Sequence, residues 1–379
     1  MGQISLESST RVGRSSRGSS REGAWGPRTV VVVVLVLFAL VFTMFQYYSS
    51  ETILESADSF IWKSSLNITP AKNNPKFQSW LVSCDDLDTT RQRGQVDAGT
   101  DDDGVVATIR NWPRDQAFNV PSHCIYGVEG YLVPISQCQC RNPTVAVPRT
   151  SDFWQKAFQR NQKLAKKAAA MVSLEGHDLD VVLLGDSITE HWIGEAGARK
   201  HAGYEENAKA FQQVLTRKGG GLVDALALGI AADQIPNLLF RLQVARYGQY
   251  LQPKVWWILI GSNDMAMAWC NVEAVLAGNI AVIEEIRETQ PGAVVVINSI
   301  LPRLPEPLLG HIDELNQRLR DYACGAKDVY FFDATSIFRD EATGQVRHLP
   351  DGVHPDGPSS WTWAREIAKA VEELTGGTR

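Results

Sequence analysis

Hydrophobic residues follow two different patterns along the chain, and the first is one long uninterrupted run. Residues 29–48 read TVVVVVLVLFALVFTMFQYY and carry no charge. A helix of this length spans about 30 Å, which is the thickness of a bilayer core. A buried core helix normally keeps a polar face, and this run has none. We therefore expect a transmembrane helix at residues 29–48.

The charges on either side of this run predict its orientation. Five arginines precede it within residues 1–28, whereas Glu51, Glu55 and Asp58 are the first charged residues after it. The positive-inside rule then predicts a cytoplasmic tail at residues 1–28 and a type II single-pass protein of the secretory pathway, in the endoplasmic reticulum, Golgi or at the cell surface. Cleavage as a signal peptide is the alternative. We favour an uncleaved anchor, because the run is long and no small-x-small site follows it directly.

From residue 151 onward short apolar runs alternate with amphipathic stretches. The apolar runs predict strands at residues 180–184, 222–228, 255–260, 293–300 and 329–333. The amphipathic stretches predict helices at about residues 152–174, 205–216, 234–245, 272–289, 312–322 and 360–374. Strands that are apolar throughout and separated by helices indicate a parallel sheet covered on both faces. We expect residues 151–379 to form a three-layer α/β/α, flavodoxin-like domain with a five-stranded parallel sheet, whose site lies at the carboxyl ends of the strands.

Residues 49–150 show little periodicity, and we interpret them as a luminal stem with a disulfide-stapled module around Cys84 to Cys140. All six cysteines lie beyond the predicted membrane span, where disulfides persist: Cys84, Cys124, Cys138, Cys140, Cys270 and Cys324. A metal site at the closely spaced Cys138 and Cys140 is the alternative, but no second ligand pair matches them, so we favour disulfides. Asn67 begins a glycosylation sequon in the same compartment.

Overall composition narrows the class of protein. The chain has 37 basic and 43 acidic residues, for a net charge of −6, with 44% hydrophobic and 21% charged residues. These values are typical of a globular protein and lack the basic excess of a nucleic-acid binder. No HExxH or phosphate-loop pattern is present. We expect no cofactor, no metal and no nucleic-acid partner.

Polar motifs with catalytic potential follow the first and last predicted strands. A Gly-Asp-Ser sequence ending at Ser187 follows strand 180–184, and Asp351 and His354 follow the last strand. Taken singly, Ser187 is more typical of a helix N-cap, and Asp351 or His354 of a surface polar group. Together they are the set that nucleophilic acyl transfer needs, because His takes the serine proton and Asp holds the imidazole tautomer.

Two further motifs follow predicted strands that lie between these two in the sequence. Asn263 follows strand 255–260, where its amide can donate a hydrogen bond to a developing oxyanion; an Asx turn closing the strand is the alternative. The turn at residues 229–233 follows strand 222–228 and leaves backbone N–H groups free before the next helix. Motifs at four strand ends together predict a hydrolase site.

These four blocks resemble the consensus blocks of the SGNH (GDSL-like) hydrolases. The stretches GDSITEHW, NLLFRLQ, PKVWWILIGSND and INSILPR are similar to the catalytic subunits of platelet-activating-factor acetylhydrolase Ib and their esterase relatives, over about residues 151–375. The resemblance implies a nucleophile, a general base, an orienting carboxylate and three oxyanion-hole donors: Ser187, His354 and Asp351 for the first three, and the Ser187 N–H, the Ala232 N–H and the Asn263 side-chain amide for the hole.

The sequence departs from this family at two positions. Ala232 replaces the usual glycine before the Asp of the second block, so we expect either a right-handed turn or an altered donor geometry. His191 stands where many relatives have glycine, and we interpret it as a surface histidine near the entrance to the site.

The combined expectation is a membrane-anchored serine esterase. It would hydrolyse short-chain esters, such as acetyl esters, of a lipid or carbohydrate through an acyl-enzyme, with the membrane contacted through residues 29–48. Two alternatives stay open. One is a luminal O-acyltransferase acting on glycans, and the other is a catalytically silent, membrane-tethered binding protein.

Overall fold

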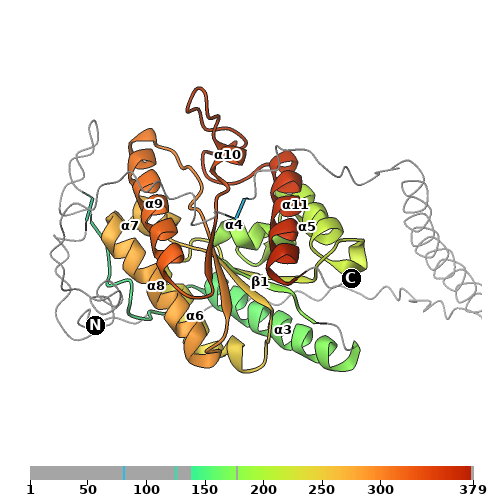
Figure 1. The fold of residues 1–379 in the computed structure, drawn as a ribbon. Helices are drawn as coiled ribbons and strands as arrows, with labels where there is room; N and C mark the ends of the chain where they lie inside the picture. Colours follow the sequence, from blue (N-terminus) through green and yellow to red (C-terminus); the bar gives the residue numbers. More distant parts are fainter. Residues whose placement is uncertain (1–79, 82–123, 126–137, 176–177, 377–379) are drawn as a thin grey trace, which may run out of the picture. The chain divides into compact units, whose positions relative to one another are not determined.

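The computed structural model describes residues 80–81, 124–125, 138–175 and 178–376 (Figure 1). The predicted cytoplasmic tail at residues 1–28, the predicted membrane span at residues 29–48 and the sequon at Asn67 lie outside these ranges. No helix within the ranges is both long enough and apolar enough to span a membrane.

Five strands of the described residues form a parallel sheet in the order β4-β1-β5-β6-β7. Their bounds are β1 (Val181–Gly185), β4 (Ala225–Gly229), β5 (Val255–Leu259), β6 (Val294–Asn298) and β7 (Val329–Phe332). All five were predicted, and their side chains are buried almost throughout because helices cover both faces. The boundary that moves most is that of β4, because the apolar run there begins with the exposed Leu222 and only joins the sheet at Ala225.

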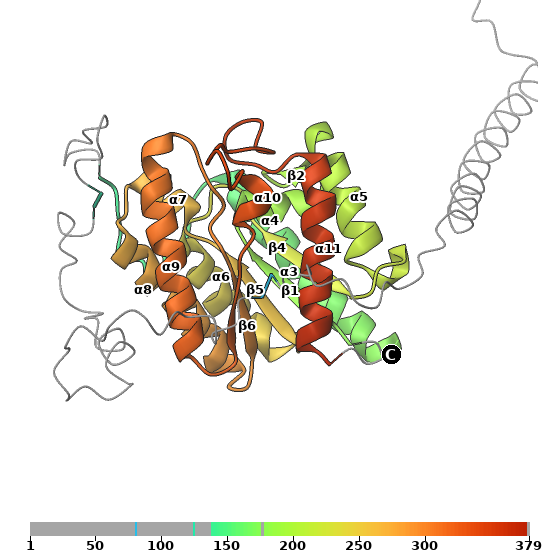
Figure 2. The same cartoon turned by 45° about the horizontal axis from the view of Figure 1, so that its top comes forward.

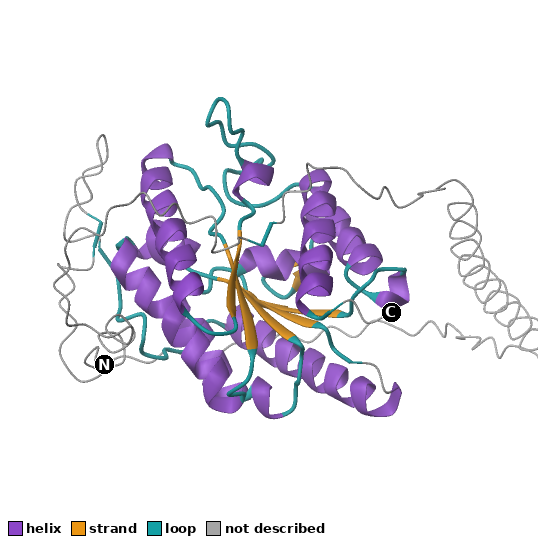
Figure 3. Ribbon diagram, viewed as in Figure 1, coloured by secondary structure: helices purple, strands orange, loops and turns teal. Residues whose placement is uncertain are grey.

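Helices form one layer on each side of the sheet (Figures 1 and 2). On one face α5 packs against α11; the opposite face is covered by α3, α6, α8 and α9. The bounds of these helices are α3 (Asp152–Glu175), α5 (Glu205–Val214), α6 (Ile235–Ala245), α8 (Val272–Thr289), α9 (Leu309–Gly325) and α11 (Gly357–Leu374). Figure 3 shows the strands enclosed between the two helical layers. The predicted three-layer α/β/α domain with a five-stranded parallel sheet is confirmed.

Strand order reverses at β1, which pairs with β4 on one side and β5 on the other. The connections after β1 and after β4 therefore leave the sheet on opposite faces. A crevice opens at the carboxyl ends of the strands at such a reversal, and ligands of open α/β sheets bind there.

Several short elements were absent from the sequence prediction. They are α4 (Ser187–Glu190), the 3-10 turn η4 (His191–Ile193), the hairpin of β2 (Glu195–Ala196) and β3 (Arg199–Lys200), α7 (Ser262–Ala268) and α10 (Thr335–Phe338). Helices of three to seven residues and strands of two residues are too short to show a hydrophobic period. Two of them, α4 and α7, begin directly beyond the carboxyl ends of β1 and β5, so they carry side chains into the crevice.

One disulfide lies within the segment before α3, and a second joins that segment to the domain. Cys124 bonds Cys138, with 6.1 Å between their Cα atoms, and Cys140 bonds Cys270, with 4.9 Å. Cys324 is disulfide-bonded as well. The expected module placed the staples among residues preceding the domain, whereas the bond from Cys140 reaches the loop that follows α7. Cys138 and Cys140 therefore belong to two different disulfides and do not form a metal-ligand pair.

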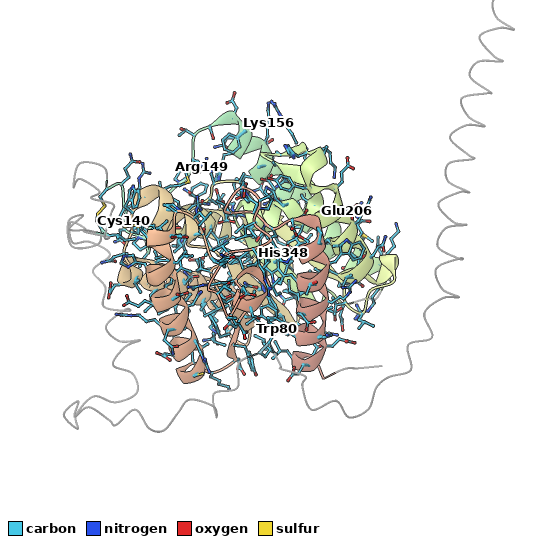
Figure 4. All side chains as sticks on the ribbon, turned by 90° about the horizontal axis from the view of Figure 1, so that it is seen from above. Trp80, Cys140, Arg149, Lys156, Glu206 and His348 are labelled. Carbon is cyan, nitrogen blue, oxygen red and sulfur yellow. A yellow bond between two sulfur atoms is a disulfide. The ribbon has the colours of Figure 1, made fainter. Side chains whose placement is uncertain are left out.

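The disulfide between Cys140 and Cys270 lies at one side of the domain. Figure 4 places Cys140 at one side of the domain and Glu206 of α5 at the other, with His348 between them. The same loop is also held by backbone hydrogen bonds, from the Ile125 N–H to the Trp269 carbonyl at 2.8 Å and from the Gln139 N–H to the Ala268 carbonyl at 3.1 Å.

Candidate active site

The predicted nucleophile lies on a tight turn at the end of β1. Gly185 ends the strand, Asp186 caps α4, and Ser187 is the first residue of that helix. The Asp186 carboxylate accepts the Ile188 N–H at 2.9 Å, which fixes the turn. A Cβ atom at Gly185 would overlap the carbonyl of Leu259 on β5, so only glycine lets the two strand ends lie this close. The turn presents Ser187 at the carboxyl edge of the sheet.

Ser187, His354 and Asp351 form one hydrogen-bonded chain. The Ser187 Oγ lies 2.9 Å from the His354 Nε2, and the His354 Nδ1 lies 2.6 Å from the Asp351 Oδ2. The other carboxylate oxygen, Oδ1, accepts the backbone N–H groups of Val353 at 2.9 Å and His354 at 2.7 Å. Because a carboxylate only accepts, these partners assign the proton to Nδ1 and leave Nε2 free to take the serine proton.

The Asp351 carboxylate stays ionised in this arrangement. Partial burial alone would raise the pKa of Asp351, but hydrogen bonds from the His354 ring, the His354 N–H and the Val353 N–H outweigh it and lower the pKa to about 2. An ionised Asp351 holds the imidazole in one orientation and stabilises the imidazolium that forms when His354 accepts a proton.

The three predicted oxyanion donors also converge on this edge. Asn263 is buried in the first turn of α7, and its Nδ2 donates to the Asp233 carbonyl oxygen at 3.0 Å and to the Asp186 Oδ2 at 3.2 Å. The backbone N–H groups of Ser187 and Ala232 have no acceptor among the described residues. Two free backbone donors and one side-chain amide thus lie at the ends of the neighbouring strands β1, β4 and β5, which is the placement expected of an oxyanion hole.

Ala232 adopts a backbone conformation that is unusual for alanine. Its φ is +58°, in the left-handed region, so the right-handed turn considered from the sequence is wrong. This conformation costs an alanine about 1 to 2 kcal/mol. The turn is held on both sides of it, because the Ala231 N–H donates to Glu190 at 2.9 Å and the Asp233 N–H donates to the Ile230 carbonyl at 3.2 Å.

A family comparison agrees with this geometry. The model of the GDSL-like Lipase/Acylhydrolase family matches residues 183–358, which contain all five predicted site residues. Residues 183–358 are thus similar to the GDSL-like hydrolases, a family of ester hydrolases.

Individual relatives of this chain are distant. Platelet-activating factor acetylhydrolase IB subunit alpha1 of Homo sapiens is 29% identical over 138 residues, covering 36% of this chain and 52% of the relative, and the Bos taurus protein gives the same values. The chain thus spans about half the length of the curated relatives it matches.

Solved structures with detectable similarity include bacterial and fungal proteins. A GDSL-like lipase from Bacteroides thetaiotaomicron is 21% identical with a TM-score of 0.44, covering 57% of this chain and 98% of its own. A carbohydrate esterase family 3 protein from Talaromyces cellulolyticus is 18% identical with a TM-score of 0.41, covering 53% of this chain and 100% of its own.

Glu190 holds the turn at residues 229–233, which contains the predicted donor Ala232. Its side chain is fully buried and accepts the Ala231 N–H, as well as the N–H groups of Gly197 at 3.0 Å and Ala198 at 2.9 Å. Arg160 of α3 neutralises it at 2.8 Å. Glu190 belongs to the GDSITEHW stretch, and no role was predicted for it from the sequence. Its position, three residues after Ser187 on the same helix, is what connects the nucleophile to the turn.

Three buried carboxyl groups lie beneath the crevice: Asp186, Asp233 and Asp264. Burial raises the pKa of Asp186 and of Asp264 to about 7 and that of Asp233 to about 6. Arg241 pairs with Asp233 at 2.8 Å, and the Ile235 N–H donates to Asp264. No group of His, Cys, Asp and Glu within the described ranges is arranged to hold a metal ion.

His191 is buried beside His354, the predicted general base, so its interpretation as a surface residue is wrong. Its side chain is 2% exposed, its ring stacks on Tyr204 with 3.4 Å between centroids, and its centroid lies 4.5 Å from that of His354. Burial, followed by the proximity of His354, lowers the pKa of His191 to about 3. The residue is therefore a neutral packing partner of His354. The turn η4 follows α4 without a break and directs this ring inward, which no periodicity in the sequence indicates.

Arg303 is a site residue that the sequence reasoning missed. It lies in the loop after β6, and its Nη1 donates to the Asn263 Oδ1 and to the Ser262 Oγ, both at 3.0 Å. The loop is joined to the loop of the triad because the Leu304 N–H donates to the Gly352 carbonyl at 3.0 Å. Its position could have indicated this role, because Arg303, like the predicted site residues, follows a strand at the carboxyl edge of the sheet.

Proposed function

We propose that this protein is a membrane-anchored serine esterase that hydrolyses short-chain esters, such as acetyl esters, of a lipid or carbohydrate in a luminal or extracellular compartment. The observation that carries the proposal is the hydrogen-bonded chain from Asp351 through His354 to Ser187. A nucleophile, a base and a group that orients the base within hydrogen-bond distance define the machinery for acyl transfer.

The first half of the reaction forms an acyl-enzyme. The Ser187 Oγ attacks the ester carbonyl carbon while His354 Nε2 takes its proton, and the Asp351 carboxylate stabilises the resulting imidazolium. The carbonyl oxygen becomes an oxyanion that accepts hydrogen bonds from Ser187, Ala232 and Asn263. When the tetrahedral intermediate collapses, the ester bond breaks and His354 donates the proton to the departing alcohol.

The second half releases the acid. A water molecule gives a proton to His354 Nε2 and attacks the acyl carbonyl carbon, and the same donors stabilise the second oxyanion. Collapse of this intermediate breaks the bond to Ser187, whose oxygen recovers the proton from His354. The products are a free carboxylic acid and the unmodified enzyme.

Two features support the compartment in this proposal. The apolar run at residues 29–48 is long enough to cross a bilayer, and its flanking charges favour an N-terminus in the cytoplasm. The disulfides of Cys124 with Cys138 and of Cys140 with Cys270 are of the kind that persists in oxidising compartments.

The name of the curated relatives supports the acetyl group, because it describes an acetylhydrolase. The similar region of platelet-activating factor acetylhydrolase IB subunit alpha1 belongs to an acetylhydrolase, and this chain matches about half of that protein. We extend the acyl group, and not the whole substrate, to the present chain.

A direct test combines turnover with active-site labelling on the purified full-length chain. Wild-type protein should hydrolyse p-nitrophenyl acetate and react with a fluorophosphonate probe. Ser187→Ala should lower kcat by a factor on the order of 10⁴ or more and abolish labelling. Ser336→Ala, at a half-buried serine outside the site, serves as the matched control. Undiminished turnover in Ser187→Ala would refute the assignment, and transfer of acetyl to an added glycan in preference to water would identify an acyltransferase instead.

A further inference from the structure

Arg303 is a half-buried cation beside the predicted site. No carboxylate of the described residues lies within ion-pair distance of its guanidinium. Burial lowers the pKa of Arg303, and the more distant carboxyl groups of Asp186 and Asp351 act in the opposite direction. Removing a cation from water without a paired anion is costly. A residue kept in such a position needs a contact that only it can make.

That contact is with the side-chain amide of Asn263. A guanidinium carries only donors, so the Asn263 atom that faces the Arg303 Nη1 at 3.0 Å must be the acceptor Oδ1. The amide is planar, and Nδ2 therefore points the opposite way, toward Asp186 and Asp233 at the base of the oxyanion pocket. Arg303 and the Asp233 carbonyl, one on each side of the amide, thus favour the same one of its two orientations.

The same contact strengthens Asn263 as a donor. A hydrogen bond from a cation to Oδ1 polarises the amide and makes its N–H groups better donors, which is the cooperativity of linked hydrogen bonds in a low dielectric. Of the two Nδ2 contacts, that to Asp186 is the longer, at 3.2 Å. The hydrogen in this contact is the one that an oxyanion can share at the least cost.

Two further contacts hold the guanidinium in place. The Ser262 Oγ accepts from the same Nη1 at 3.0 Å, at the start of α7. On the other side the Leu304 N–H donates to Gly352, which lies between Asp351 and His354. The loop after β6 therefore connects the Asn263 half of the site to the half that carries the catalytic histidine.

We propose that Arg303 is a positioning residue that acts through Asn263: by holding Oδ1 it keeps Nδ2 directed into the oxyanion pocket and raises its strength as a donor. This inference rests on the proposed esterase function. Arg303 touches no reacting atom, so its substitution should change kcat through Asn263. This change should disappear when Asn263 is absent.

The test compares five variants of the full-length chain with a neutral ester, p-nitrophenyl acetate. Arg303→Met should lower kcat roughly 10- to 100-fold, less than the loss expected from removing the Asn263 donor itself, with KM changed less than about threefold. Arg303→Lys, which keeps a donor-only cation, should recover part of the loss. The double variant Arg303→Met with Asn263→Ala should be no slower than Asn263→Ala alone. Arg318→Met, at an exposed arginine of α9, is the control and should match the wild type.

Several results would overturn the inference while leaving the proposed function intact. One is an active wild type whose kcat is unchanged by Arg303→Met. Another is a loss confined to KM or to anionic esters, which would make Arg303 a substrate-binding group. Additive losses in the double variant would exclude action through Asn263.

If the wild type shows no turnover, the proposed function fails, and crystal structures of the wild type and Arg303→Met then decide the inference separately. The positioning role predicts that the Asn263 amide rotates away from Asp186 and Asp233 in the variant. An amide that keeps both contacts would contradict it.

Discussion

The two halves of the site each contain an aspartate, and the two carboxyl groups serve opposite purposes. Asp351 has a half-exposed side chain, 52% accessible, and hydrogen bonds lower its pKa to about 2. Asp264 is 2% exposed, and burial raises its pKa to about 7. The first carboxylate is ionised and acts on His354, whereas the second accepts the Ile235 N–H inside the protein.

The difference shows that chemistry and support are separated in this domain. The triad depends on charge at a solvent-accessible edge, where a fixed anion orients the base. The oxyanion half depends on buried groups such as Glu190 and Arg303, which hold a turn or an amide in place without taking part in bond formation. Substitutions in the first half should therefore affect rate most, and substitutions among the buried carboxyl groups should affect stability.

The largest expected effect in this comparison comes from Asp351→Asn. Loss of the carboxylate removes the acceptor that holds the Nδ1 proton of His354, so the imidazole adopts the wrong tautomer and kcat should fall by about 10⁴. Thermal unfolding should change little, because the side chain is half exposed. Steady-state kinetics with p-nitrophenyl acetate measures the loss, and a decrease of less than about tenfold would remove Asp351 from the triad.

An intermediate effect is expected from Asn263→Ala in the oxyanion half. Removing one oxyanion donor lowers kcat by about 10² to 10³ in other enzymes, and we expect a loss in that range with KM little changed. The same kinetic assay measures it. A rate equal to that of the wild type would make Asn263 a purely structural residue that caps the end of β5.

The smallest effect on rate, and the clearest effect on stability, is expected from the buried carboxyl group of Asp264. Its pKa is raised in the folded state, so the folded protein binds more protons than the unfolded chain between about pH 4 and pH 7. The stability it contributes is complete below pH 4 and is lost as the pH rises through about 7. Between pH 5 and pH 8 this loss is on the order of 3 kcal/mol.

Asp264→Asn isolates this contribution, because asparagine keeps one acceptor oxygen for the Ile235 N–H but does not titrate. Urea unfolding at pH 5 and pH 8 should show a smaller decrease in stability for the variant than for the wild type. An equal decrease in both proteins would place the pKa of Asp264 near its ordinary value. Asp313→Asn, at an exposed carboxylate of α9, provides the comparison.

Much of the fold followed from the sequence because parallel strands buried on both faces leave a strong pattern. Strands such as Val255–Leu259 are apolar throughout, and the polar motifs after them had to meet at one edge of the sheet. Ser187, Asp351 and His354 were therefore predicted to lie together at that edge. Asn263 was found in the same way, from its position at a strand end.

The parts that escaped prediction depend on packing between distant segments. The burial of His191 results from the turn of η4 against Tyr204 and His354, and nothing local distinguishes it from a surface histidine. Arg303 contacts Asn263 across 40 positions of sequence, and Cys140 reaches Cys270 across 130. Ala232 adopts its left-handed φ because Glu190 and the surrounding turn impose it, against the local preference of alanine.

The central claim is that Ser187 carries the acyl group between the two halves of the reaction. Acid quenching of the full-length protein during turnover of p-nitrophenyl acetate, followed by digestion and mass spectrometry, tests it most directly. The peptide containing Ser187 should gain the mass of one acetyl group, and the adduct should be absent from Ser187→Ala. Turnover at the wild-type rate with no adduct on Ser187, or an adduct on another residue that Ser187→Ala does not abolish, would contradict the account.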